Sequence, residues 1–241
     1  MITEITKPQF RDNPEQAAAS YWRNGYHIEY DVWTAAECDR ITELAYGCPD
    51  RAIGDYSPLM QPHRKIRELL SYLRKVEIVD TIELLLKGEA SGLQSEYYFG
   101  APGIKGFARH QDNFYLEAQM GAFVSTWSAL TDVSPENGGL FLFPGTHREP
   151  ILPTAKLTGG SGDNQDPNSN NEEAVVPPQY DAVDATLPKG AVIYLHGNVV
   201  HGSHANTSDR FRSAILFTYI RHGVAYRSGR YAKRTEIPLH V

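Results

Sequence analysis

The second half of the chain alternates short β-type runs with turn-forming clusters, and this alternation constrains the fold more than any other feature of the sequence. Such runs are rich in β-branched and aromatic residues and are separated by Gly, Pro, Asn and Asp: LQSEYYFG, FVSTWSALTDV, GLFLFPG, KGAVIYLH and SAILFTYIRH. Runs of this length and composition, bounded by turn formers, are typical of strands. The pattern predicts a β-sandwich or barrel over residues 91–225.

The first ninety residues have a mainly helical pattern, apart from the β-type run GYHIEYDVW. Thr34 and Glu37 match a capping box, which marks the start of a helix. Apolar residues recur at helical spacing across residues 65–86, which predicts one or two amphipathic helices. We therefore expect residues 1–90 to form a mainly helical cover on a single domain that spans residues 1–241.

One segment interrupts the β-rich half of the chain. The stretch TGGSGDNQDPNSNNEE is close to low complexity, and the region around it, residues 153–186, shows little regular patterning. A loop of this length inside a compact domain is usually functional or disordered. We expect residues 153–186 to be a lid loop that closes a functional site from water.

Composition and charge exclude several classes of protein. The chain has 241 residues and a formal net charge of −6, and no Lys/Arg run stands out as the footprint of a nucleic-acid binder. No apolar run approaches the ~20 residues that a membrane-spanning helix needs, and the N-terminus lacks the apolar core of a signal peptide. Cys38 and Cys48 do not form a metal-binding pair and are expected to be reduced thiols. These features predict a cytoplasmic protein with no nucleic-acid or membrane partner, and they give no oligomeric state.

His110 and Asp112 lie two positions apart within GFARHQDNFY. In an extended segment, residues i and i+2 point to the same side, so this imidazole and this carboxylate would converge. Converging side chains of these types can bind a metal ion or can simply hydrogen-bond to each other. The pair alone does not separate the two hypotheses.

The stretch HGNVVHGSHANTSDRFR contains further groups that could complete a site. If residues 206–209 form a hairpin turn, Ser203 lies opposite Arg212, and His201 shares their face. A guanidinium matches both oxygens of a carboxylate, so this face suits a short dicarboxylic acid whose other end binds a metal. Two His and one carboxylate are the ligand set typical of non-haem Fe(II) oxygenases.

Taken together, these motifs resemble the phytanoyl-CoA dioxygenase family of Fe(II)/2-oxoglutarate-dependent oxygenases. The resemblance covers about half of the chain and depends on three pieces: the triplet His110-Gln111-Asp112, Trp127 through ENGGLFLFPGTHR, and His201-Gly202-Ser203 with Arg212 eleven residues after His201. It implies mainly β with α as the fold class: a double-stranded β-helix, which is a jelly-roll or cupin-like core, with helices packed on one side.

The resemblance also assigns roles to individual residues. His110, Asp112 and His201 are implied to be the catalytic ligands of Fe(II). The co-substrate 2-oxoglutarate is implied to be held or surrounded by Arg212, Ser203, Trp127 and Gln94.

The implied reaction uses O2 to oxidise a small-molecule metabolite, while 2-oxoglutarate is converted to succinate and CO2. Halogenating relatives have a small residue at the position of Asp112, so its carboxylate favours hydroxylation over halogenation. Desaturation, epoxidation and ring closure remain open. The identity of the substrate is open too, with a free metabolite of a biosynthetic pathway favoured.

A second class of protein fits the same residues. A cupin-like barrel could be a metal-dependent dioxygenase or isomerase, or a non-catalytic small-molecule binder, without using 2-oxoglutarate. In that case Arg212 would have a structural role. Binding of 2-oxoglutarate that depends on Arg212 separates the two hypotheses.

Other residues near the motifs have both structural and functional interpretations. His196 and His204 are an odd number of positions from His201, so strand parity favours a structural role for each. An aromatic group could line a substrate pocket or belong to the core, and the sequence does not separate these alternatives: Tyr97, Tyr98, Phe99, Phe114 and Tyr115.

Overall fold

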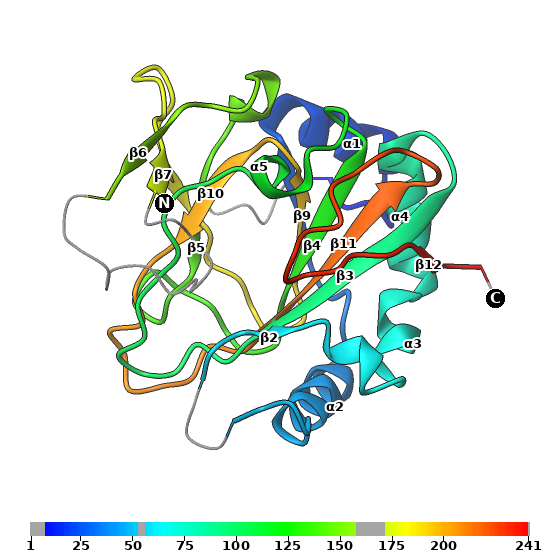
Figure 1. The fold of residues 1–241 in the computed structure, drawn as a ribbon, viewed down its shortest axis with the longest axis vertical. Coiled ribbons are helices and arrows are strands. Elements are labelled where there is room, and N and C mark those ends of the chain that lie inside the picture. Colours follow the sequence, from blue (N-terminus) through cyan, green and yellow to red (C-terminus); the bar gives the residue numbers. More distant parts are fainter. Residues whose placement is uncertain (1–7, 53–55, 158–171, 241) are drawn as a thin grey trace.

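The computed structural model describes residues 8–52, 56–157 and 172–240 (Figure 1). The larger of its sheets has seven antiparallel strands in the order β1-β9-β4-β11-β3-β12, with β2 also paired to β3. Their bounds are β1 Tyr26–Glu29, β2 Leu59–Met60, β3 Ala90–Tyr98, β4 Phe123–Ala129, β9 Val192–His196, β11 Ala214–Arg221 and β12 Ile237–Pro238.

A smaller antiparallel sheet has the order β10-β5-β8, and β6 pairs with β7 separately. The bounds of these strands are β5 Leu140–Phe143, β6 Thr154–Lys156, β7 Glu172–Ala174, β8 Val183–Asp184 and β10 Val200–Ser203. In Figure 1 the smaller sheet lies beside one face of the larger sheet, and helices lie against the other face. This confirms the predicted fold class, a double-stranded β-helix with helices on one side.

The helices follow the local signals of the sequence. Their bounds are α1 Pro14–Asn24, α2 Ala35–Tyr46, α3 Leu69–Leu73, α4 Val76–Leu86 and α5 Asn113–Leu116, with short 3-10 turns at η2 Pro62–Arg64 and η3 Thr146–Arg148. The capping box before α2 is confirmed, since Glu37 N donates to Thr34 Oγ1 at 3.2 Å and Thr34 N donates to Glu37 Oε2 at 2.8 Å. The amphipathic run over residues 65–86 forms two helices, α3 and α4.

Strand β11 shows how the two faces of the large sheet are divided. Ile215, Phe217 and Tyr219 are fully buried in the core that joins this sheet to the helices. Leu216 and Thr218 point to the opposite face, where they line a pocket. The two-residue period of a strand therefore supplies a helix-covered face and a pocket face from one run of residues.

The predicted hairpin between Ser203 and Arg212 is wrong. Ser203 pairs with Leu140 on β5, whereas β11 begins at Ala214 in the other sheet and pairs with β3 and β4. Between the two strands the chain crosses from one sheet to the other. Asn206 fixes this corner, because its side-chain amide donates to Gly100 O at 2.8 Å and to Arg210 O at 2.7 Å.

The segment predicted as a lid, residues 153–186, is described only in part. Residues 158–171 lie outside the described residues, so the lid stays a prediction. The flanks contain strands β6, β7 and β8, contrary to the expectation of little regular structure. Strand β7 is tied to the chain before His110, because Ala174 N donates to Arg109 O at 2.8 Å and Glu173 forms a two-bond ion pair with Arg109 at 2.8 Å.

The predicted β core, residues 91–225, does not contain all strands of the large sheet. Strand β1 comes from the first ninety residues, and β12 comes from beyond residue 225, yet both are paired within that sheet. That the whole chain forms one domain stays a prediction.

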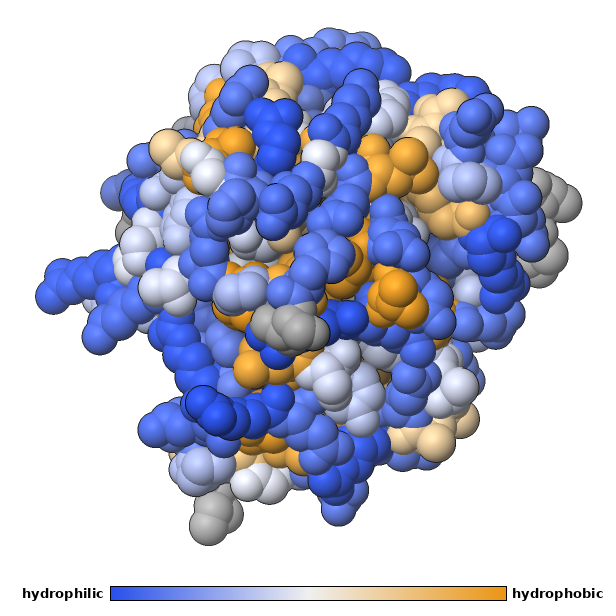
Figure 2. All heavy atoms as spheres, turned by 90° about the vertical axis from the view of Figure 1, so that its right-hand side faces the viewer, coloured by the Kyte–Doolittle hydropathy of each residue, from blue (hydrophilic) through white to orange (hydrophobic). Residues whose placement is uncertain are grey.

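The surface on the helix-covered side is mostly hydrophilic, with apolar residues visible in patches between polar ones (Figure 2). Val76 and Leu84 of α4 are among the exposed apolar residues. Across the described ranges, the helices are too short or too polar to cross a bilayer.

Candidate active site

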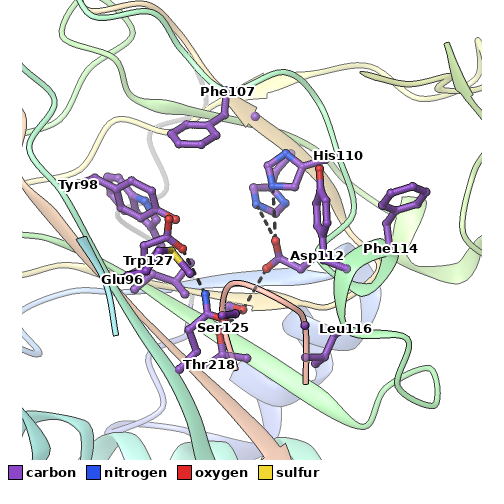
Figure 3. Close-up of a pocket in the computed structure, with 18 of the residues that line it drawn as sticks. Glu96, Tyr98, Phe107, His110, Asp112, Phe114, Leu116, Ser125, Trp127 and Thr218 are labelled. Carbon is purple, nitrogen blue, oxygen red and sulfur yellow. Dashed lines mark hydrogen bonds and ion pairs between the residues drawn. The ribbon is translucent and has the colours of Figure 1, made fainter. Parts of the chain in front are cut away.

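A pocket of about 690 Å³ lies on the face of the large sheet away from the helices. Strands β3, β4 and β11 of the large sheet, β10 of the smaller sheet, the turn at α5 and residues 227–234 contribute to its walls. Figure 3 shows labelled side chains from β3, β4, β11 and the region of α5 around one space. The volume is within the range of pockets that bind small molecules.

His110 and His201 are brought together by a backbone bridge. His110 N donates to His201 O at 2.8 Å, and His201 N donates to His110 O at 3.0 Å. Residues that are directly opposite in an antiparallel pair have their side chains on the same face. The two imidazole centroids are accordingly 4.5 Å apart.

Each of these imidazoles is held in the tautomer that a metal requires. His110 Nδ1 lies 2.8 Å from Ala108 O, and His201 Nδ1 lies 3.1 Å from Val199 O. A carbonyl oxygen only accepts, so Nδ1 carries the hydrogen in both rings and Nε2 keeps its lone pair. Metal-binding histidines are usually oriented by a hydrogen bond of this kind.

Asp112 completes the cluster. Its Oδ1 lies 3.5 Å from His110 Nε2 and 3.8 Å from His201 Nε2, and its Oδ2 accepts a hydrogen bond from Ser125 Oγ at 3.0 Å (Figure 3). The predicted convergence of His110 and Asp112 is confirmed. The reason differs, because Asp112 has helical backbone angles at the start of α5 and is not extended.

The protonation states of the cluster favour cation binding. Burial alone would raise the pKa of Asp112, but the His201 and His110 imidazoles and the Ser125 hydroxyl together hold it below its usual value. Burial, together with the nearby His110, lowers the pKa of His201 to about 4. Ligands must be deprotonated to bind a metal, so these shifts leave Asp112 and His201 in the forms that bind a cation at neutral pH.

The described residues thus include a group of three potential ligand atoms, all within 4.8 Å of one another, on His110, Asp112 and His201. Two imidazole nitrogens and one carboxylate oxygen are the donors that suit non-haem Fe(II). The cluster also faces a pocket large enough for further ligands. The residues present therefore fit an iron ion.

Arg212 lies on the wall of the same pocket and is only 2% exposed. Its Nε has no hydrogen-bond partner among the residues that the structure describes, and its guanidinium carbon lies 5.5 Å from the centroid of the Trp127 ring. Burial lowers the pKa of Arg212 to about 10, so it remains a cation at neutral pH. An unpaired buried cation is costly, so this guanidinium fits a carboxylate ligand such as the far end of 2-oxoglutarate.

Glycines make room for this guanidinium. A Cβ placed on Gly100 would lie 3.2 Å from Arg212 Cζ, and Gly100 has a φ of +50°. A Cβ on Gly138, at φ +90°, would lie 3.5 Å from Arg212 Nη2. The positive φ would strain a side chain at either position, and at Gly100 the added Cβ would also collide with the backbone oxygen of Arg212.

The other predicted co-substrate residues lie on the same pocket. Ser203 and Trp127 line it, and Ser203 Oγ accepts a hydrogen bond from Phe107 N at 2.9 Å. Gln94 also lines it, but its Oε1 accepts a hydrogen bond from Arg234 Nε at 2.6 Å. The roles of these residues toward 2-oxoglutarate stay predictions.

The ambiguous aromatic residues divide between pocket and core. Tyr98, Phe114 and Tyr115 line the pocket, whereas Tyr97 and Phe99 are fully buried in the core beside the helices.

Both histidines interpreted as structural lie away from the cluster. His204 Nε2 lies 2.7 Å from Asp184 Oδ1, and His196 is buried beside His147 with a centroid distance of 5.1 Å.

Sequence reasoning missed the contribution of the C-terminal segment. Arg227, Arg230 and Arg234 line the pocket, although the predicted β core ended at residue 225. The stretch RSGRYAKR, residues 227–234, contains four basic residues and no acidic one, so the expectation that no Lys/Arg run stands out was wrong here. This basic composition was the sequence signal that could have pointed to the contribution of residues 227–234 to the site.

Comparison with known proteins agrees with this geometry. Residues 21–214 match the model of the family described as phytanoyl-CoA dioxygenase (PhyH). The phytanoyl-CoA dioxygenase domain-containing protein 1 of Danio rerio is 32% identical over 176 residues, which are 69% of this chain and 54% of that relative. The phytanoyl-CoA dioxygenase of Arabidopsis thaliana is 27% identical over 210 residues, 81% of this chain and 72% of the relative. The chain thus spans about half the length of the first of these relatives.

Two solved structures share the fold. The non-heme alpha ketoglutarate dependent carbocyclase SnoK from nogalamycin biosynthesis has a TM-score of 0.71 at 21% identity, covering 93% of this chain and 90% of its own. EvdO2 from Micromonospora carbonacea var. aurantiaca, solved with 2-oxoglutarate, has a TM-score of 0.69 at 17% identity, covering 88% of this chain and 91% of its own. On the family match and the curated relatives, this chain belongs to the phytanoyl-CoA dioxygenase family, whose members use Fe(II), 2-oxoglutarate and O2.

Proposed function

We propose that this protein is an Fe(II)/2-oxoglutarate-dependent hydroxylase of a small-molecule metabolite. The observation that carries the proposal is the cluster of His110, Asp112 and His201, with both Nε2 atoms facing Asp112. On the same pocket lies Arg212, whose Nε has no hydrogen-bond partner within the described ranges.

In this proposal each group has a defined task. His110, Asp112 and His201 would hold the iron, and Arg212 with Ser203 would bind the far carboxylate of 2-oxoglutarate. Bound iron with 2-oxoglutarate and O2 supplies the oxidising chemistry, and the co-substrate leaves as succinate and CO2. The surrounding chain orients the substrate and excludes water, which is the usual contribution of a protein to cofactor chemistry.

The choice of hydroxylation depends on Asp112. A carboxylate occupies the position where the halogenating relatives have a small residue, so the ligand set leaves no such place for a halide. Structures of similar fold include an epimerase, SnoN, solved with Fe3+, alpha ketoglutarate and nogalamycin RO, and the carbocyclase SnoK. Hydroxylation is therefore the specific part of the proposal, within a family that is established by sequence.

The proposal also covers the binding partner and the cellular compartment of the protein. The partner is a free small metabolite, with no nucleic acid and no membrane, and the compartment is the cytoplasm. Cys38 and Cys48 are both free and buried, as expected of reduced thiols there.

Ligand-induced stabilisation tests the use of 2-oxoglutarate. Mn(II) with N-oxalylglycine, an unreactive analogue of 2-oxoglutarate, should raise the melting temperature of the wild-type protein, because a ligand that binds only the folded state stabilises it. Arg212→Ala should abolish the part of the rise that depends on N-oxalylglycine. Arg210→Ala, which removes an exposed arginine from the same corner, is the matched control and should leave the rise unchanged.

The alternative protein class gives a different result. A cupin-like metalloprotein that does not use 2-oxoglutarate would be stabilised by Mn(II) alone, and N-oxalylglycine would add nothing in any variant. If the first result holds, a metabolite screen triggered by succinate release should yield a product that has gained one oxygen atom. A product that has only lost two hydrogens would contradict hydroxylation and favour desaturation or ring closure.

A further inference from the structure

We infer that the substrate carries a carboxylate group and that Arg234 is the specificity-determining residue that binds it. This inference rests on the proposed function, since it takes Arg212 to be occupied by 2-oxoglutarate. Like Arg212, Arg234 lies on the pocket and has guanidinium N–H groups that are not used within the described part of the protein.

Arg234 is carried by a turn that its own backbone closes. Lys233 N donates to Gly229 O at 3.0 Å, and Arg234 N donates to Ser228 O at 2.9 Å. Ser228 Oγ donates to Arg234 O at 2.9 Å. These bonds fix the position from which the Arg234 side chain enters the pocket.

Two side chains from the region of η2 tether the same turn. Gln61 Nε2 donates to Ala232 O at 3.1 Å, and Arg64 Nη2 donates to Lys233 O at 2.6 Å. The turn is therefore held from within and from the neighbouring segment. A group that is already in place loses less entropy when it binds a ligand.

One edge of the Arg234 guanidinium is used within the protein. Its Nε donates to Gln94 Oε1 at 2.6 Å, and its Nη1 makes a long contact of 3.4 Å with Arg227 O. Gln94 in turn donates to Glu96 Oε2 at 3.2 Å. The Nη2 group of Arg234 makes no hydrogen bond to any residue that the structure describes, so one edge of the fork is available to a ligand in the pocket.

No acidic side chain of the described ranges forms an ion pair with Arg234. Arg227, by contrast, pairs with Glu117 at 2.8 Å. The charges of Asp112 and Glu96 stabilise the Arg234 cation from a distance, but neither forms an ion pair with the guanidinium, so its free edge can still pair with a carboxylate of a ligand. With the far carboxylate of 2-oxoglutarate on Arg212, we assign the direct partner of Arg234 to the substrate.

A single carboxylate fits this pocket better than a polyanion does. The planar guanidinium fork matches the two oxygens of a carboxylate. Glu96 and Glu172 line the same pocket and would repel a chain of phosphates. Phe114 and Tyr115 on the wall suit an apolar body attached to the carboxylate.

The rim of the pocket adds a second cation. Arg230 is exposed and lines the pocket, and its guanidinium lies 5.7 Å from the ring centroid of Tyr231. An exposed cation at the mouth of a cleft raises the local concentration of anionic ligands. The net charge of −6 for the whole chain makes this positive rim a local feature.

The test compares carboxylates with their neutral amides. The probes are 3-phenylpropanoate, indole-3-acetate and octanoate, each beside its primary amide. All measurements are made with saturating Mn(II) and N-oxalylglycine, so that the site at Arg212 is filled. At least one carboxylate should raise the melting temperature of the wild-type protein further than its amide does.

Variants then assign the preference to Arg234. Arg234→Gln should weaken binding of that carboxylate on the order of 10- to 100-fold, the loss expected for a charge-assisted hydrogen bond, and leave the amide unaffected. Arg234→Lys keeps the charge without the fork, so it should keep the preference at reduced affinity. Arg64→Gln removes an arginine that tethers the same turn from outside the pocket, so it should weaken binding of the carboxylate much less than Arg234→Gln does and should keep the preference over the amide.

The outcomes separate the inference from the function on which it depends. If Mn(II) and N-oxalylglycine do not stabilise the wild-type protein, the proposed function fails. If they do, the inference alone fails when no carboxylate exceeds its amide, or when the preference survives Arg234→Gln. An equal loss in Arg64→Gln would assign the effect to the turn and contradict the role of the guanidinium. Should Arg234→Gln not fold, wild-type affinity in Arg234→Lys overturns the inference.

Discussion

Ser125 orients the only carboxylate of the proposed iron site. Its hydroxyl donates to Asp112 Oδ2 at 3.0 Å and also lies 3.4 Å from Thr218 Oγ1. With Oδ2 engaged, Oδ1 is the oxygen that faces His110 and His201. Outer partners of this kind tune a metal site without touching the metal.

Removing the Ser125 hydroxyl should therefore weaken metal binding. Ser125→Ala should lower the Mn(II) affinity on the order of 10- to 100-fold, as measured by isothermal titration calorimetry. The matched control is Ser128→Ala on the same strand, because the Ser128 hydroxyl is buried and has no hydrogen-bond partner in the described part of the chain. Equal affinities for Ser125→Ala and wild type would show that this hydrogen bond does not orient the ligand.

At the scale of single residues, the sequence predicted which types of side chain form the proposed iron site. The His-x-Asp spacing led to the right pair of converging groups, even though Asp112 is helical. The spacing could not reveal Ser125, because the hydrogen bond to Asp112 spans thirteen residues and depends on the position of β4. Contacts of this kind follow from tertiary structure and have no local signature.

At the scale of elements, α4 supplies much of the core that joins the helices to the large sheet. Ile78, Ile82 and Leu85 are at most 1% exposed and lie in that core, whereas Leu84 on the same helix is 44% exposed. The spacing of the buried residues is the helical period that the sequence shows. The helix therefore supports the sheet from the face opposite the pocket.

Truncating one buried leucine should show how much this support contributes. Leu85→Ala should lower the free energy of unfolding by ~2–5 kcal/mol, because it leaves a cavity in a core that is fully buried. Leu84→Ala, the matched control one residue away, should change it by only ~0.5 kcal/mol. Urea denaturation measures both. Similar losses for the two variants would contradict the orientation of α4.

Elements were the most predictable level of the fold, and their pairing was the least predictable. Hydrophobic periodicity and the capping box located α2, α4 and the main strands. The pairing of Ser203 with Arg212 was wrong because turn-forming residues at 206–209 are equally compatible with a hairpin and with a corner between sheets. Asn206 forms the corner through bonds to Gly100 O and Arg210 O, and one of these partners is remote in sequence.

At the scale of the whole molecule, the proposed active site is assembled from both sheets and from the C-terminal segment. His201 comes from the smaller sheet, Arg212 from the corner that leads back to the larger sheet, and Arg234 from beyond the last long strand. The family motifs identified the first two. They gave no information about Arg234, because the resemblance ends near residue 221 and the basic segment 227–234 lies outside it.

The most direct test of the central claim is the visible absorption of the protein with Fe(II) and 2-oxoglutarate under anaerobic conditions. A keto acid chelated to a ferrous ion that is held by His110, Asp112 and His201 should give a weak visible charge-transfer band. Asp112→Ala should lose the band, and His204→Ala, which removes a histidine outside the cluster, should keep it. Full Fe(II) binding without a band in the wild-type protein, or an unchanged band in Asp112→Ala, would contradict the account.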